Sequence, residues 1–264
     1  QLNNDFTNIK KKEINLVNIN YNKFSFSKRK ITSGSNQFIE NSFNKALEII
    51  KKRNCLGLIN GPISKKTFLK GKYNGITEYL AKKTGAKNPV MLIYNNKLSV
   101  SPLTTHIPLS KVSQKINKKL IISKIKRINY FYKNVIKKKP VFAITGLNPH
   151  CESFGIENKE KKEIIPAIRY LKKNKINIKG PYASDTIFLK ENIRKFDVIF
   201  GMYHDQVLAP MKTLYGFNAI NITLGLPFLR ISPDHGPNIQ MLGKNKSDPS
   251  SLIESIRFLK NNAN

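Results

Sequence analysis

The chain of 264 residues has no tryptophan, two cysteines and few acidic side chains. Cys55 and Cys151 are far apart and fit no metal-binding spacing, which excludes a disulfide framework and agrees with a reducing compartment. No apolar run approaches the roughly 18 to 20 residues that span a membrane, and no apolar signal segment opens the chain. These absences predict a cytoplasmic protein without a membrane partner.

Two common nucleotide-binding motifs are also missing. The chain has no G-x-x-x-x-G-K-S/T loop and no G-x-G-x-x-G segment after an apolar run. If a dinucleotide binds, it is therefore not held by a Rossmann fingerprint. Isolated glycines such as Gly61, Gly75, Gly225 and Gly236 are candidates for close backbone approach, but ordinary turns explain each of them.

Acidic residues number 16 against 47 lysines and arginines, so the formal net charge is +31. Such an excess is typical of nucleic-acid binding, because Lys and Arg neutralise phosphates and release counterions. The basic residues are nevertheless scattered in short runs, and no RNA-binding or helix-turn-helix pattern accompanies them. We interpret them as a solvated surface and expect no specific nucleic-acid partner. A basic nucleic-acid-binding protein stays the less favoured alternative.

The sequence does contain a regular alternation of apolar runs and amphipathic stretches. The apolar runs predict strands at residues 55–59, 89–94, 98–103, 141–145, 196–202, 219–224 and 228–232. Apolar residues at helical spacing predict helices at residues 36–52, 77–83, 112–116, 121–132 and 163–173, and after Asp248. Ser35 is the expected cap of the first helix, and Leu252, Ile256 and Leu259 form one face of the last. This alternation predicts an α/β fold with a mostly parallel sheet.

The four histidines, His106, His150, His204 and His235, each follow a predicted strand. Ligands of α/β proteins bind outside the carboxyl ends of the strands, so side chains at those ends can gather in space. Three neutral imidazoles with an open position are a common catalytic metal arrangement. A hydrogen-bonded loop residue is the alternative explanation for each histidine taken alone.

Three aspartates lie in similar turns. Asp205 follows His204 directly and is placed to orient its ring. Asp185 and Asp234 also follow apolar segments. Turn or helix capping explains each of these two as well as catalysis does.

Six ordered segments carry a family resemblance. They are residues 58–65 (LINGPISK), 74–78 (NGITE), 104–109 (TTHIPL), 146–150 (GLNPH), 202–206 (MYHDQ) and 221–230 (NITLGLPFLR), with 234–236 (DHG) following. From about Ser33 to its end the chain resembles the 4-hydroxythreonine-4-phosphate dehydrogenase family. The resemblance implies a two-lobed α/β/α fold like that of isocitrate and isopropylmalate dehydrogenases. The first lobe would be residues 1–76 plus 225–264, and the second, residues 77–224, would carry the metal ligands and the contacts of a homodimer.

The resemblance also implies a site between the two subunits. The matching metal ligands are His106, His150 and His204, and the matching substrate-binding residues are Thr77, Lys212, Asn221 and Arg230. We expect His204, Asp205 and Asp185 to be catalytic. The implied cofactors are NAD or NADP and a divalent metal (Zn, Mg or Co). The implied reaction oxidises 4-phosphooxy-L-threonine to 2-amino-3-oxo-4-phosphooxybutanoate, which decarboxylates to 3-amino-2-oxopropyl phosphate in pyridoxine 5'-phosphate synthesis.

Three features depart from the family pattern. Ile76 stands where the family has histidine before Thr77, and an isoleucine cannot donate a hydrogen bond. Losing a contact to a charged group costs roughly 1.5–3 kcal/mol. Ile76 therefore motivates an alternative, a sister dehydrogenase acting on threonate or erythronate phosphate. Pro237 replaces a usual threonine, and the N-terminal strand–helix units are missing from a chain that starts with Gln1. We accordingly expect an incomplete first lobe.

Overall fold

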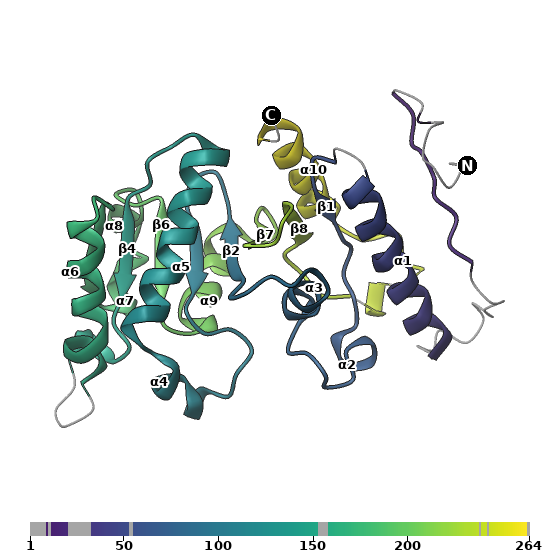
Figure 1. The fold of residues 1–264 in the computed structure, drawn as a ribbon. Helices are drawn as coiled ribbons and strands as arrows, with labels where there is room; N and C mark the ends of the chain where they lie inside the picture. Colours follow the sequence, from purple (N-terminus) through teal and green to yellow (C-terminus); the bar gives the residue numbers. More distant parts are fainter. Residues whose placement is uncertain are drawn as a thin grey trace.

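The computed structural model describes residue 9 and residues 12–20, 33–52, 55–152, 158–237, 239–241 and 243–262. In this part of the chain a single sheet has the strand order β1-β8-β7-β2-β3-β6-β4-β5 (Figure 1). The strands are β1 (Leu58–Ile59), β2 (Val90–Tyr94), β3 (Ser99–Pro102), β4 (Phe142–Thr145), β5 (Ile178–Tyr182), β6 (Val198–Gly201), β7 (Ile220–Leu224) and β8 (Arg230–Pro233).

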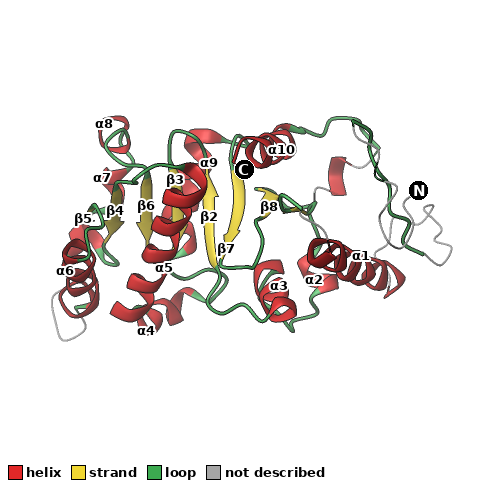
Figure 2. Cartoon of the chain, turned by 45° about the horizontal axis from the view of Figure 1, so that its top comes forward, coloured by secondary structure: helices red, strands yellow, loops and turns green. Residues whose placement is uncertain are grey.

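Helices cover both faces of this sheet. They are α1 (Ser33–Lys52), α2 (Lys65–Phe68), α3 (Ile76–Thr84), α4 (Val112–Lys115), α5 (Lys118–Phe131), α6 (Ile165–Lys173), α7 (Ser184–Ile187), α8 (Lys190–Ile193), α9 (His204–Tyr215) and α10 (Ser250–Asn262). Figure 2 shows α5 in front of the strands and α9 behind them.

The alternation of side chains along each strand divides the core into two layers. Val90 and Leu92 of β2 belong to the layer beneath α5 and α6, whereas Met91 and Ile93 belong to the layer beneath α7, α8 and α9. Successive strand residues point to opposite faces, so a strand covered on both sides is apolar throughout. The continuous apolar runs of the sequence therefore correspond to central, doubly covered strands.

The strand directions decide which strand ends lie together. Pairing is parallel for β1·β8, β3·β6, β4·β6 and β4·β5, and antiparallel for β2·β3, β2·β7 and β7·β8. The predicted α/β class is confirmed, and the sheet is mixed with a parallel majority. The carboxyl ends of β3, β4 and β6 meet at one edge. From β3 through β2 and β7 to β8, each pair is antiparallel, so β8 runs opposite to β3. The loop that follows β8 therefore starts from the other edge of the sheet.

Several local predictions differ from the structure. Helix α9 and strand β5 are absent from the sequence-based prediction, because Pro210 interrupts one pattern and Gly180-Pro181 the other. Ser35 lies inside α1 rather than at its cap. In α10 the expected apolar face is wrong in part, since Leu252 and Ile256 are exposed and Phe258 and Leu259 are buried.

The predicted lobe boundary at residues 224 and 225 falls between two strands that pair with each other, β7 and β8. The division into lobes stays a prediction. Cys55 and Cys151 are free thiols, as expected. None of the helices in the described ranges is long and apolar enough to cross a membrane.

Candidate functional site

A cavity of about 350 Å³ lies over one face of β2, β7 and β8. Its floor follows from the strand register, because Ile93, Asn221 and Ser232 form one row across the three strands. Met91 and Arg230 lie in the next row, on either side of Thr223. The polar side chains of the floor therefore come from antiparallel strands, and the site occupies a sheet face as well as the predicted edge.

Helix α9 forms one wall of the cavity. His204, Leu208 and Lys212 all line it. They are spaced by four residues, which places them on one side of an α-helix. The same four-residue spacing is visible in the sequence, but Pro210 lies within it, and a proline inside a segment argues against a helix. The wall brings a histidine and a lysine into one cavity.

Two of the four histidines meet across the cavity. The ring centres of His106 and His204 are 5.7 Å apart. The segment that carries His106 is fixed beside the one that carries His204, because the Thr104 hydroxyl donates to the Met202 carbonyl at 2.8 Å. His204 Nδ1 lies 2.6 Å from Asp205 Oδ1, so Nε2 is the ring nitrogen left for another ligand. Asp205 is therefore placed to orient the ring, as predicted.

The other end of the cavity is cationic. Arg230 is 3% exposed, and it donates to Asn60 Oδ1 at 2.7 Å and Thr223 Oγ1 at 2.9 Å, both neutral acceptors. Among the described residues it makes no ion pair. Burial lowers the pKa of Arg230 to about 10, and the charge of Glu78 opposes this shift, so the guanidinium stays protonated at neutral pH.

Lys212, by contrast, is compensated by a carboxylate. Its Nζ lies 2.6 Å from Asp234 Oδ2 and also donates to the Asp234 carbonyl. Burial raises the pKa of the Asp234 carboxyl, whereas the Lys212 ammonium lowers it. Thr77 and Asn221 complete the predicted substrate set around the same cavity. The Asn221 Oδ1 atom is buried and has no hydrogen-bond partner within the described part of the chain.

The remaining predicted residues lie elsewhere. His150 is exposed, in a turn where its φ is 53°, and it does not line the cavity. Asp185 is exposed at the start of α7. Burial raises the pKa of the Cys151 thiol, and the negative charge of Asp185 raises it further. His150 and Asp185 thus belong to a second region, around the ends of β4 and β5. Within the residues that the structure describes, no three His, Cys, Asp or Glu side chains could hold one metal ion.

The comparisons with known proteins agree with these motifs. A family model described as pyridoxal phosphate biosynthetic protein PdxA matches residues 1–259. The chain belongs to the PdxA family. The 4-hydroxythreonine-4-phosphate dehydrogenase of Sulfurihydrogenibium sp. (strain YO3AOP1) is 42% identical over 249 residues, which cover 93% of this PdxA-family chain and 75% of that relative.

Solved structures support the same family and fold. The 4-hydroxythreonine-4-phosphate dehydrogenase from Klebsiella pneumoniae matches with a TM-score of 0.75 at 29% identity, over 89% of this chain and 73% of that one. Isocitrate dehydrogenase from Methylococcus capsulatus shares the fold alone, with a TM-score of 0.50 at 13% identity over 85% and 70% of the two chains. This PdxA-family chain spans 75% and 65% of the first two curated relatives.

Three site residues of this PdxA-family chain escaped the sequence-based prediction. Thr223 Oγ1 accepts from Arg230 and lies 3.2 Å from Thr77 Oγ1, and Asn60 holds Arg230 from the loop after β1. Gln206 bonds to several strand ends behind His204. Thr223, Asn60 and Gln206 all lie within the quoted motifs, but their partners are distant in sequence. A motif can therefore contain such residues without indicating their contacts or their role.

Proposed function

We propose that this chain is an NAD(P)-dependent, divalent-metal-assisted dehydrogenase that oxidises 4-phosphooxy-L-threonine. The supporting observation is that one cavity joins two facing histidines to a buried arginine that forms no ion pair among the described residues. The product, 2-amino-3-oxo-4-phosphooxybutanoate, would then lose carbon dioxide. The reaction would belong to pyridoxine 5'-phosphate synthesis, in keeping with the family.

The two facing histidines fit a metal site. Imidazoles that bind one cation through nitrogen at about 2.1 Å hold their ring centres roughly 5–6 Å apart, and the measured distance is 5.7 Å. We assign His106 and His204 as ligands from one subunit. A divalent cation held there would supply Lewis acidity toward the substrate hydroxyl.

The third ligand in this proposal is His150 of a second copy of the chain. His150 is exposed and does not line its own subunit's cavity, so it is free to approach a neighbouring one. Asp185 lies in the same region. We therefore propose a homodimer in which each site combines the cavity of one subunit with the His150 and Asp185 region of the other.

The cationic end of the cavity suits the substrate phosphate. Glu78 acts on Arg230 electrostatically, but among the described residues no carboxylate forms an ion pair with it, so the buried guanidinium favours an anion in direct contact. Its guanidinium can hold a phosphate through two parallel hydrogen bonds. Lys212 and Asn221, whose Nδ2 can donate to a phosphate oxygen, lie around the same space. Together they orient the phosphate, so that the hydroxyl to be oxidised lies toward His106 and His204.

Oxidation removes a hydride from carbon and a proton from oxygen. NAD(P) would accept the hydride, and a second cavity of about 500 Å³, which shares Pro62, His235 and Gly236 with the first, offers room beside the site. We assign the proton to a carboxylate, Asp205 of one subunit or Asp185 of the other. Asp205 also keeps the His204 ring in one tautomer through its bond to Nδ1.

The test is metal binding and turnover in a His204→Ala variant. We expect the variant to lose its bound metal and its metal-dependent reduction of NAD, with the fold largely intact. His235→Ala is the control for metal binding alone: it removes an exposed imidazole that also borders the cavity proposed for NAD(P), and it should keep the metal whatever its turnover. Near-normal activity of His204→Ala with 4-phosphooxy-L-threonine would contradict the proposal.

A sister activity on another 4-phosphorylated hydroxy acid is the second candidate. Ile76 favours it, because this buried apolar side chain lines the cavity next to Thr77. The phosphate site and the histidines would serve such a substrate equally well. A panel of 4-phosphooxy-threonine, threonate phosphate and erythronate phosphate, followed by NADH absorbance, distinguishes the two. The substrate with the highest kcat/KM identifies the activity.

A further inference from the structure

The Gln206 amide connects three separate strand ends behind the cavity. Its Oε1 accepts from the Met202 backbone N–H at 2.6 Å and from the Thr145 hydroxyl at 2.9 Å. Its Nε2 donates to the Gly146 carbonyl at 2.8 Å and to the Ser184 hydroxyl at 2.7 Å. A glutamine amide has two acceptor sites and two N–H donors, so every one of them is used. The side chain is 8% exposed.

Each bond leads to a segment that carries a candidate site residue. Met202 directly follows β6 and lies two residues before His204, and Ser184 directly precedes Asp185. Gly146 begins the turn that ends in His150, and this turn folds tightly, because a Cβ at Gly146 would lie 2.8 Å from Cys151 Sγ. The three segments follow different strands, which are also paired through their backbones, β4 with β5 and β4 with β6. The Gln206 amide adds a side-chain link beyond the ends of this pairing.

The backbone around Gln206 is shaped to admit its amide. A Cβ at Gly201 would lie 3.0 Å from Gln206 Oε1 and 2.4 Å from Val207 Cγ1. Only glycine leaves room for the start of α9 to approach β6 this closely. The amide is therefore fixed in position and in orientation, since a flipped amide would direct Nε2 at the Met202 N–H.

We propose that Gln206 is a positioning residue for the metal site. Its amide sets the placement of His204 relative to the His150 turn and Asp185, and so shapes both halves of each site in the homodimer. This inference rests on the proposed function, because it assumes that these histidines bind a metal. Replacing a residue that orients a metal ligand typically weakens metal binding by about 10- to 100-fold.

The experiment is a titration of the metal-free full chain with Co²⁺, followed by visible absorption, for wild type, Gln206→Glu and Ser184→Ala. Gln206→Glu keeps the shape but directs a carboxylate oxygen at the Gly146 carbonyl. We expect a Co²⁺ dissociation constant about 10- to 100-fold higher and an altered absorption band. Ser184→Ala removes a single bond and should give a smaller change in the same direction. Gln114→Glu, the same chemical change at an exposed residue of α4, is the control.

The outcomes separate the two proposals. If wild type binds no Co²⁺, the proposed metal site itself is wrong. If wild type binds Co²⁺ and both variants bind it with the same affinity and the same spectrum, Gln206 has only a structural role, even where the melting temperature falls. If Gln206→Glu does not fold, Ser184→Ala decides, and wild-type affinity and spectrum in that variant overturn the inference.

Discussion

Lys124 is a lysine enclosed by the core, on the face of α5 that lies against the sheet. Its side chain is 8% exposed, and Nζ donates to the Leu103 carbonyl at 2.7 Å, three residues before His106. Burial lowers the pKa of Lys124 from 10.5 to about 8, and the charge of Glu78 opposes this shift. The side chain holds the His106 segment at the cost of burying a charge.

Lys124 should make stability depend on pH. Below about pH 8 both the folded and the unfolded chain hold its proton, and the burial cost is fully present. Between about pH 8 and 10.5 the folded chain has released a proton that the unfolded chain still binds, so stability rises with pH. Relative to Lys124→Met, wild type should gain up to about 3 kcal/mol in free energy of unfolding over this range.

Urea unfolding at several pH values measures this difference. Lys126→Met is the control, because Lys126 lies on the same helix but is exposed, and its curve should stay parallel to that of wild type. Parallel curves for wild type and Lys124→Met would show that the buried ammonium does not titrate in this range.

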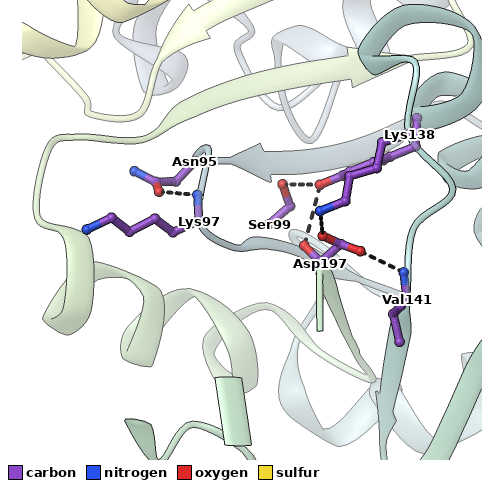
Figure 3. Close-up of polar contacts among 7 residues, drawn as sticks. Asn95, Lys97, Ser99, Lys138, Val141 and Asp197 are labelled. Carbon is purple, nitrogen blue, oxygen red and sulfur yellow. Dashed lines mark hydrogen bonds and ion pairs between the residues drawn. The ribbon is translucent and has the colours of Figure 1, made fainter. Parts of the chain in front are cut away.

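At the scale of elements, the beginning of β6 is fixed at the end opposite to His204. Figure 3 shows Asp197, which precedes β6, bonded to Lys138 and Val141, both in the segment that leads into β4. Its Oδ2 accepts from the Val141 N–H at 2.8 Å, and Oδ1 accepts from Lys138. The Tyr132 hydroxyl donates to Ser99 Oγ at 2.8 Å beside it. This network joins the segment that follows α5 to β3 and to the residues that immediately precede β4 and β6.

Asp197→Ala should therefore destabilise the fold without changing the metal site. Losing the acceptor of the Val141 N–H costs about 1–3 kcal/mol. Lys138→Ala, which removes only the exposed partner of the ion pair, should cost about 1 kcal/mol or less. Urea unfolding measures both values, and Co²⁺ titration should give wild-type affinity. An equal loss in the two variants would contradict the assigned importance of the Val141 bond.

The same elements explain what a sequence can predict here. β2, β4 and β6 are covered on both faces, so their apolar runs indicate strands without any tertiary information. α9 and β5 escape prediction because a proline interrupts each pattern although the surrounding structure tolerates it. For the site, the family resemblance identifies His106, Lys212 and Arg230, which the structure brings to one cavity. The partners of Gln206 do not follow from any motif, since the Thr145 bond joins residues 61 positions apart.

At the scale of the whole molecule, the net charge of +31 is the dominant electrostatic feature. Many of the lysines are exposed, among them Lys137, Lys138 and Lys139, and their field attracts polyanions and small anions alike. The two kinds of partner respond differently to salt. A surface that binds nucleic acid without a specific site loses affinity steeply as counterions compete. A buried cationic site such as that of Arg230 is screened much less.

A salt series should therefore separate a diffuse charge from a specific function. Filter binding of duplex DNA should be measurable at low salt and vanish near 0.15 M, where the Debye length is about 8 Å. The kcat/KM for 4-phosphooxy-L-threonine should fall only moderately over the same range, because salt weakens attraction during approach but not the contacts of the enclosed phosphate. DNA affinity that survives 0.15 M salt would favour the nucleic-acid-binding alternative, since only specific or closely matched contacts resist that screening.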